Sequence, residues 1–361
     1  MPARARSRRA RGGFRHLTVA RVDQLCSDAA AITFDVPDEF AEEFAFLPGQ
    51  SVTVRRAFDG REERRSYSIC APRGAAPRIG VREVPDGAVS SWLIHEVRPG
   101  DEVEVEVPSG RFTPDLDTPA HHGFIAAGSG ITPVLSMAAS VLADPASKAT
   151  IVYANRRTDS VMFADEVADL KDAHPTRLQL VHVLSREAQE VELFSGRLTA
   201  DKLRLLLPLI CRVEAVDHWW LCGPYGMVTD AVGVLTELGV ETDSIHRELF
   251  YVEDVPPPPA EHPEAPPTGA VSAVTIVLDG RTTTTQGPRD TPILDGAQRV
   301  RPDLPFACKG GVCGTCRAQL VSGEVNLRRN FALEPSELTA GFVLTCQSLP
   351  VSDAVTVDYD R

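Results

Sequence analysis

The chain has 361 residues, of which 43% are hydrophobic and 24% charged, and its formal net charge at pH 7 is −13. This length predicts two or three domains, and the composition is that of an ordinary globular protein. No segment approaches the roughly 18 consecutive apolar residues that a membrane span needs. The acidic balance gives no support to a nucleic-acid partner. We therefore expect neither a membrane nor a nucleic acid among the partners.

Residues 1–13, MPARARSRRARGG, carry five arginines with no hydrophobic stretch behind them. They lack the apolar core of a signal peptide, so they are predicted to form a disordered basic tail. The eight cysteines of the chain fit a reducing compartment, and a cytoplasmic location is expected. Cys26, Cys70 and Cys211 lie in apolar or strand-like segments and are expected to be core thiols.

Residues 14–118 contain six short stretches with alternating or β-branched apolar positions, separated by Pro-Gly and Asp-Gly turn signals. The stretches are FRHLTVARV, AITFDV, SVTVRRAF, RRSYSIC, RIGVREV and DEVEVEV. Six strands at this spacing predict a small antiparallel β-barrel. One interruption is predicted, a helix over 88–97 that starts immediately after Gly87.

In residues 119–252 strand and helix alternate. HGFIAAGSGITP predicts an apolar strand, a Gly-rich turn and a helix that runs to about Leu142. The alternation continues through ATIVYANR, FADEVADLKDA, RLQLVHVLS, a helix near Leu203, HWWLCGP, a helix over 225–238 and a strand at IHRELF. This order predicts an α/β domain with a doubly wound parallel sheet.

Residues 253–270 contain seven prolines and predict a semi-rigid linker. Residues 271–361 are predicted to form a ferredoxin-like β-grasp (α+β) domain. It begins with a hairpin that turns at Asp279-Gly280. Thr291 is the predicted N-cap of the next helix, with Pro292 at its first position.

The C-terminal domain contains FACKGGVCGTCR, in which Cys308, Cys313 and Cys316 have the spacing C-x4-C-x2-C, and Cys346 adds a distant fourth thiolate. This is the plant-type ligand pattern of a 2Fe–2S cluster. The glycines of the loop let it wrap closely and aim N–H groups at the sulfurs. A structural zinc site usually shows paired C-x2-C knuckles, and a disulfide framework belongs to small secreted chains, so the spacing favours the cluster.

Two motifs in the barrel predict a flavin site. Period-2 alternation in RRSYSIC puts Arg65 and Tyr67 on one face of a strand and Ser68 on the other, so Tyr67 can stack on a flavin ring while Arg65 meets a phosphate. Gly87 and Ser90 lie where the helix begins, and the free N–H groups of a helix N-terminus suit a pyrophosphate. Alone, R-x-Y-S is more often just a strand and G-x-x-S more often just an N-cap, so the prediction rests on the two together.

The α/β domain carries the signals of a dinucleotide site. Gly128-Ser129-Gly130 stands between a strand and a helix, and Cys222-Gly223-Pro224 ends another strand; a buried strand thiol is the alternative reading of Cys222. The second strand ends in Asn155-Arg156-Arg157, with no acid there to bind a ribose 2′-hydroxyl. Two guanidiniums suit a 2′-phosphate and favour NADPH over NADH, although the same pair also fits a solvated turn.

Taken together, R-x-Y-S, G-x-x-S and the two strand ends resemble the ferredoxin–NADP reductase superfamily. The resemblance implies that the flavin is held by Arg65, Tyr67, Ser68, Gly87, Val89 and Ser90, with Val81 and Arg82 close by. It implies a nicotinamide nucleotide held by Gly128, Gly130, Thr132, Pro133, Arg156, Arg157, Cys222, Gly223 and Pro224, with Phe250 near the flavin. In this reading Ser68 and Thr132 position the reactive nitrogen of the flavin, while Cys222 and Glu248 frame the nicotinamide. FAD is expected rather than FMN because the glycine–serine helix start can take a diphosphate, although some relatives with a C-terminal ferredoxin domain use FMN.

A nicotinamide gives up two electrons at once and a 2Fe–2S cluster takes one, so a flavin is needed between them. The expected protein is an NAD(P)H-dependent flavin/iron–sulfur oxidoreductase that passes electrons from NADPH to FAD, to the cluster and to an external acceptor.

The likeness is closer still to the reductase subunits of multicomponent phenylacetyl-CoA epoxidases (ring-1,2-monooxygenases) of phenylacetate catabolism, in segments such as RRSYSICAP, AAGSGITPVLS, LCGPYGM and PFACKGGVCGTCRA. It implies that the partner is the di-iron oxygenase component of such a monooxygenase. A reductase for a Rieske-type dioxygenase or another hydroxylase is the alternative. A redox-sensing binding protein is the alternative of another class.

Overall fold

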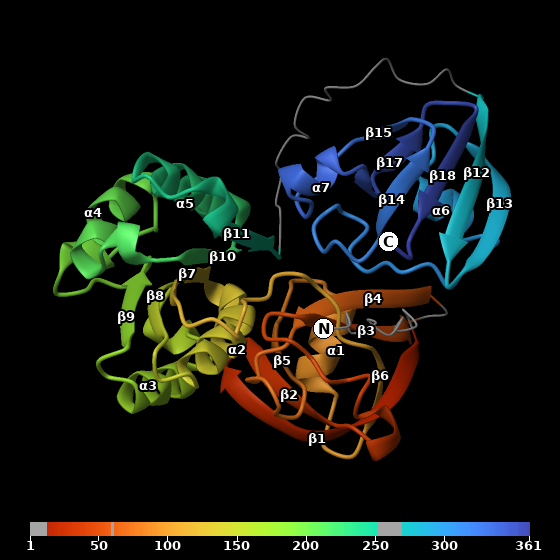
Figure 1. Cartoon of the computed structure of the whole chain (residues 1–361). Coiled ribbons are helices and arrows are strands. Elements are labelled where there is room, and N and C mark those ends of the chain that lie inside the picture. The colour runs from red at the N-terminus through yellow and green to blue at the C-terminus, as the bar shows by residue number, and fades with distance from the viewer. Residues whose placement is uncertain (1–12, 59–60, 251–268) are drawn as a thin grey trace, which may run out of the picture. The chain divides into compact units, whose positions relative to one another are not determined.

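The computed structural model describes residues 13–58, 61–250 and 269–361 (Figure 1). Most of the described chain falls into two compact units, a larger one over residues 15–250 and a smaller one over residues 269–361. Nearly all of the predicted basic tail and Pro-rich linker lies outside the described residues. Within these residues no helix is long and apolar enough to cross a bilayer.

The first part of the larger unit is a six-stranded antiparallel barrel, as predicted. Its strands are β1 (Phe14–Cys26), β2 (Ala29–Asp35), β3 (Ser51–Phe58), β4 (Arg61–Ser68), β5 (Arg78–Arg82) and β6 (Glu102–Glu106). They follow the order β4-β3-β6-β1-β2-β5, and a bridge between Ile69, just after β4, and Ile79 of β5 closes the ring. Helix α1 (Ala88–His95) begins after Gly87, where the sequence predicts it.

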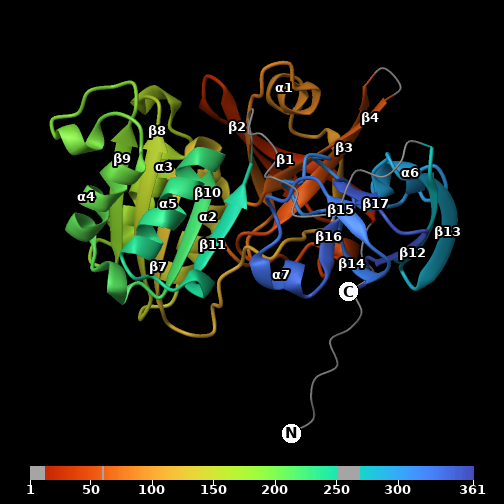
Figure 2. The ribbon, with the colours of Figure 1, turned by 90° about the horizontal axis from the view of Figure 1, so that it is seen from above.

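The second part of this unit is a parallel sheet of β7 (His121–Ala127), β8 (Lys148–Asn155), β9 (Leu178–Leu184), β10 (His218–Gly223) and β11 (Ile245–Leu249). The helices are α2 (Ile131–Leu142), α3 (Ala164–Ala173), α4 (Ala200–Ile210) and α5 (Tyr225–Glu237), and they cover both faces of the sheet (Figure 2). The strand order β11-β10-β7-β8-β9 reverses direction between β7 and β10. In such sheets ligands bind outside the carboxyl ends of the strands at this switch point, where the Gly128 turn and Cys222 lie.

Hydrogen bonds and ion pairs join the barrel to the parallel-sheet domain. The Ser136 hydroxyl in α2 donates to the Ala71 carbonyl oxygen at 2.6 Å. Arg78 of β5 contacts Asp23 at 3.0 Å and Glu166 of α3 at 3.2 Å. Gly80 lets β5 approach closely, because a Cβ there would lie 2.5 Å from Cγ2 of Thr132. These contacts fix how the barrel strands meet the switch point.

The smaller unit has the predicted β-grasp arrangement. Its elements are β12 (Val271–Leu278), β13 (Arg281–Pro288), α6 (Ile293–Ala297), β14 (Arg317–Ser322), β15 (Val325–Leu327), α7 (Pro335–Thr339), β16 (Phe342–Leu344), β17 (Ser348–Pro350) and β18 (Ala354–Asp358). The main sheet follows the order β13-β12-β18-β14-β16, with β12 and β18 parallel. The β12–β13 turn uses the left-handed region at Asp279 and Gly280, with φ of 54° and 70°.

Two local predictions were wrong. Helix α6 begins at Ile293 with Pro292 as its N-cap and no side-chain cap, while the Thr291 hydroxyl donates to Asp290 instead. Of the three expected core thiols only Cys70 is buried, and Cys26 and Cys211 are half-buried.

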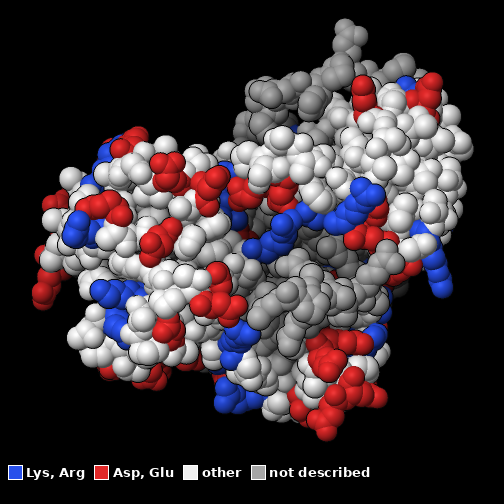
Figure 3. Space-filling view, in the orientation of Figure 1, with Lys and Arg blue, Asp and Glu red and all other residues white. Residues whose placement is uncertain are grey.

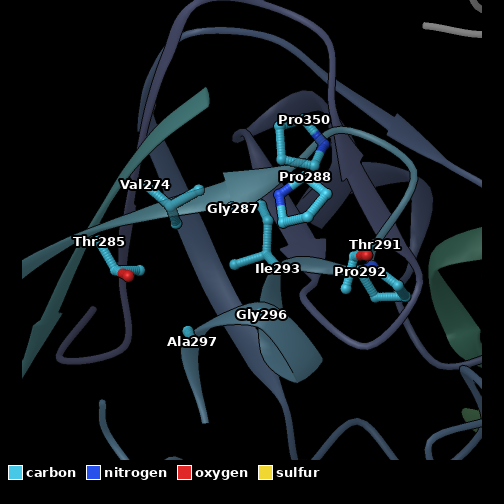
Figure 4. A pocket seen from close by; sticks show the side chains of 10 residues that line it. All are labelled: Val274, Thr285, Gly287, Pro288, Thr291, Pro292, Ile293, Gly296, Ala297 and Pro350. Carbon is cyan, nitrogen blue, oxygen red and sulfur yellow. The ribbon is translucent and has the colours of Figure 1, made fainter. Parts of the chain in front are cut away.

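An apolar void of about 10 Å³ beside α6 (Figure 4) has room for no ligand larger than water.

Candidate functional site

The four cysteines of the C-terminal motif meet on one side of the smaller unit. Cys308, Cys313 and Cys316 lie in the loop between α6 and β14, and Cys346 follows β16. Gly311 and Gly314 adopt positive φ values of 80° and 68°, which let the loop curl back on itself. Backbone N–H groups of Gly310 and Cys313 point at Cys308 Sγ, at 3.3 and 3.4 Å.

The thiols are arranged two and two. Cys308 and Cys313 form one hydrogen-bonded pair, and Cys316 and Cys346 form the other. Hydrogen bonds from the Cys313 thiol and from backbone N–H groups lower the pKa of Cys308 to about 5. Within the described chain no three donors converge on one metal ion. Two adjacent pairs of sulfurs are what two irons with two thiolates each require, so the residues fit a 2Fe–2S cluster.

A buried polar chain supports these ligands from behind. The Tyr359 hydroxyl donates to Thr345 Oγ1 at 2.7 Å, and that hydroxyl donates to the Cys316 carbonyl oxygen at 3.0 Å. Gln347, beside Cys346, donates from Nε2 to the Lys309 carbonyl oxygen at 2.7 Å. These hydrogen bonds hold the segment around Cys346 against the loop that carries the other three cysteines.

The R-x-Y-S motif lies on β4 as predicted. Ser68 is buried and Tyr67 half-buried, and burial raises the pKa of the Tyr67 phenol. Arg65 is 49% exposed and pairs with Glu63 at 2.9 Å. A half-exposed guanidinium on a weak surface pair is available to a phosphate, so the residues of β4 fit a flavin.

At the start of α1, Ser90 closes a turn. Its hydroxyl accepts from the Val84 N–H at 3.1 Å and donates to the Gly87 carbonyl oxygen at 3.0 Å. A Cβ at Gly87 would lie 2.7 Å from Ser90 Oγ and 2.9 Å from the Val84 oxygen. Ser90 therefore shapes the helix start, and Val89 beside it is buried in the barrel core.

Three predicted residues from three strands meet at the switch point. The Ser68 hydroxyl of β4 donates to Glu248 Oε2 of β11 at 3.2 Å, although 180 residues separate them. Cys222 is the register partner of Glu248 across β10 and β11. Burial raises the pKa of Glu248 to about 7, and the Ser68 hydroxyl opposes this shift. Burial also raises the pKa of the Cys222 thiol, which is fully buried.

Other predicted residues have roles within the protein itself. The Thr132 hydroxyl donates to the Ser129 carbonyl oxygen at 2.9 Å. Gly130 is needed for packing, because its Cβ would lie 2.2 Å from the Cys222 carbonyl oxygen. Arg82 donates to the Ser160 carbonyl oxygen and lies 3.6 Å from Asp28, which makes it a clamp between the barrel and the parallel-sheet domain.

The remaining predicted residues lie around this point. Val81 is buried in the barrel core, Pro133 is buried in the first turn of α2, and Gly223 is buried at the end of β10, with Pro224 as the N-cap of α5. Phe250 is partly buried and packs against the hydrophobic core that contains residues of α2 and of the parallel sheet. An open groove of about 530 Å³ between the barrel and α2 and α3 contains none of the predicted site residues.

A third arginine, which the sequence analysis did not single out, lies close to the two arginines after β8. Arg156 and Arg157 are exposed, and the Arg186 N–H after β9 donates to the Arg156 carbonyl oxygen at 2.7 Å. Three exposed arginines therefore follow two neighbouring parallel strands at the carboxyl edge of the sheet. The signal was available, since β8 and β9 were both predicted as consecutive parallel strands whose carboxyl ends share an edge.

Comparison with known proteins identifies an FAD-binding, an NAD-binding and a 2Fe–2S domain in the same three parts of the chain. Family models match at residues 16–113 (oxidoreductase FAD-binding domain), 124–233 (oxidoreductase NAD-binding domain) and 276–351 (2Fe-2S iron-sulfur cluster binding domain). One component of the 1,2-phenylacetyl-CoA epoxidase from Escherichia coli K12 is 39% identical, over 96% of this chain and 98% of that protein.

The ferredoxin reductase component of 3-ketosteroid-9-alpha-monooxygenase from Mycolicibacterium smegmatis is 36% identical, over 96% of this chain and 97% of that protein. The solved structure of phthalate dioxygenase reductase has the same fold, with a TM-score of 0.59 and 24% identity over 96% of this chain and 98% of that one.

Proposed function

The chain belongs to the ferredoxin–NADP reductase superfamily, in the group that ends in a 2Fe–2S domain, and from this premise we propose that it is the reductase component of a phenylacetyl-CoA epoxidase. It is an NAD(P)H-dependent flavin/iron–sulfur oxidoreductase that uses FAD, a nicotinamide nucleotide and a 2Fe–2S cluster. The observation that carries the proposed partner is the 39% identity to an epoxidase component over nearly the whole of both chains.

A bound FAD would supply the conversion between a two-electron hydride donor and the one-electron cluster. Arg65 and Tyr67 would hold the flavin on β4, and the N-terminus of α1 would meet its diphosphate. The Ser68–Glu248 pair at the switch point can take up or release a proton near neutral pH, because the pKa of the Glu248 carboxyl is raised to about 7. Cys222 would border the nicotinamide site as a neutral thiol, since burial raises its pKa.

We also propose that NADPH is the preferred donor. Arg156, Arg157 and Arg186 support this, because together they offer a 2′-phosphate several charged donors at one sheet edge. A cytoplasmic location is proposed as well, since four thiolates that must stay reduced suit a reducing compartment. Activity in the cytoplasmic fraction of a gently lysed cell would check that location.

A reconstitution tests the proposed partner. The purified holoprotein, NADPH and the catalytic subunits of a phenylacetyl-CoA epoxidase are mixed, and loss of phenylacetyl-CoA is followed against an NADH control. Loss that requires this protein and is faster with NADPH supports both proposals. No loss, despite rapid reduction of an artificial one-electron acceptor, keeps the electron-transfer activity and assigns the protein to a different oxygenase.

A further inference from the structure

Three cationic residues surround the cysteine loop, and we call Lys309, Arg328 and Arg329 the cluster rim. Lys309 follows the ligand Cys308 directly. The Arg328 N–H donates to the Gln347 carbonyl oxygen at 2.9 Å, one residue from the ligand Cys346. A Cβ on Gly311 would lie 3.0 Å from the Arg329 carbonyl oxygen.

The two arginines lie in the segment between β15 and α7 (Figure 1). A later residue of this segment also contacts the cysteine loop. The Phe331 N–H donates to the Gly311 carbonyl oxygen at 3.0 Å. Each rim residue is thus within one residue or one backbone contact of the cysteine loop or of Cys346.

The charge of the rim comes mainly from its two arginines. Lys309 Nζ lies 2.8 Å from Asp295 and is locally neutralised. Arg328 and Arg329 are exposed, and no ion pair or side-chain hydrogen bond joins either of them to another described residue. Several other arginines of the unit are paired, such as Arg317 with Glu337 at 2.8 Å.

Two arginines without a paired carboxylate among the described residues therefore lie beside the cluster, in a domain whose total formal charge is close to zero. Residues 271–361 carry ten Asp or Glu and nine Lys or Arg, and the whole chain has a net charge of −13. In Figure 3 acidic side chains are spread over the helices of the parallel-sheet domain. Cys308, the ligand next to Lys309, is exposed, so the cluster site comes closest to solvent at this rim.

We propose that the cluster rim is the surface on which the electron acceptor docks, and that the acceptor presents an acidic face to it. The proposal rests on the proposed function, in which the acceptor is an oxygenase component. One electron leaves the reduced cluster and reduces the acceptor, with no atom transferred. Electron transfer slows steeply with distance, so docking at the exposed edge favours it, and opposite charges steer the encounter.

The test compares single-charge variants of the full-length holoprotein. Arg328→Gln and Arg329→Gln each remove one rim charge. Arg281→Gln is the matched control, because Arg281 is an exposed arginine at the β12–β13 turn outside the cysteine loop. After anaerobic reduction with NADPH, reoxidation of the cluster is followed by stopped-flow absorbance with ferricyanide, an anion, and with hexaamminecobalt(III), a cation.

At low salt each rim variant should lower the ratio of the ferricyanide rate to the cobalt rate by about threefold, and the effect should vanish near 0.5 M salt. The control should leave the ratio unchanged. In the same proteins the dissociation constant for the phenylacetyl-CoA epoxidase oxygenase component should rise roughly threefold or more in the rim variants alone. The midpoint potential of the cluster is measured in every variant.

Rim variants that behave like the control would overturn the proposal. So would a shift in midpoint potential that accounts for the whole rate change, because the arginines would then tune the cluster instead of docking a partner. An unchanged dissociation constant alongside altered small-acceptor rates would overturn docking at this surface. If the unaltered protein fails to bind the epoxidase component, the proposed partner is wrong, and the two small acceptors still decide whether the rim selects anionic acceptors.

Discussion

The Ser68–Glu248 contact makes a prediction about stability and pH. Glu248 is partly buried, and its pKa in the folded chain is about 7 against an ordinary value of 4.5. Below pH 4.5 the carboxyl is protonated in both the folded and the unfolded chain. As pH rises toward 7 the unfolded chain loses this proton and the folded chain keeps it, so stability falls across this window.

The difference between the two pKa values corresponds to roughly 3 kcal/mol, and the residual exposure of the side chain makes this an upper value. Glu248→Gln removes the titration. The free energy of unfolding of this variant, relative to the unaltered chain, should therefore rise by roughly 1–3 kcal/mol between pH 4.5 and pH 8.

Urea denaturation of the apoprotein measures this quantity at each pH. All three tryptophans, at 92, 219 and 220, lie in the larger unit, so their fluorescence reports on its unfolding. Ser68→Ala is the matched variant. It removes the hydroxyl that holds the pKa of Glu248 down, so the loss of stability should extend to higher pH. A difference between Glu248→Gln and the unaltered chain that stays flat from pH 4.5 to 8 would refute the reasoning.

Three further predictions concern other parts of the site. Cys313→Ser should leave flavin bleaching by NADPH nearly intact and abolish reduction of an external one-electron acceptor through the cluster; unchanged output would contradict the route. Gly130→Ala should lower the free energy of unfolding by about 2 kcal/mol, because the new Cβ would lie 2.2 Å from the Cys222 carbonyl oxygen. Urea titration followed by tryptophan fluorescence measures this free energy. Arg186→Ala should raise KM for NADPH by roughly tenfold, the cost of one charge-assisted hydrogen bond, and leave KM for NADH unchanged; an equal rise for both would remove Arg186 from the 2′-phosphate site.

Local sequence signals were sufficient for the elements and the cluster ligands. A strand with one buried face carries apolar residues at every second position, and a strand buried on both faces is apolar throughout. Each pattern can therefore be read from the strand's own residues, without knowing its neighbours. The cluster ligands were also predictable from a local pattern, since three of the four cysteines lie within nine consecutive residues.

The site between the strand ends required the tertiary structure. Ser68 and Glu248 meet because α2 and α3 hold the barrel against the parallel sheet, and no short-range pattern encodes that contact. Gly130 illustrates the limit further. The sequence predicts Gly130 as part of a dinucleotide site, and the structure adds that a Cβ there would lie 2.2 Å from the Cys222 carbonyl oxygen of β10. The same packing places Arg82 between the two domains.

The β18 strand has a consequence for how the cluster domain is made. It lies at the centre of its sheet, between β12 and β14, yet it is the last of these strands to be synthesised. A growing chain therefore presents Cys308, Cys313 and Cys316 before the strand that completes their sheet exists. The sheet behind the cysteine loop is completed only after synthesis has passed Asp358, because until then β12 and β14 lack the strand that joins them. Loss of residues 354–358 should leave a nascent domain that exposes its thiols to oxidation instead of a shorter working ferredoxin.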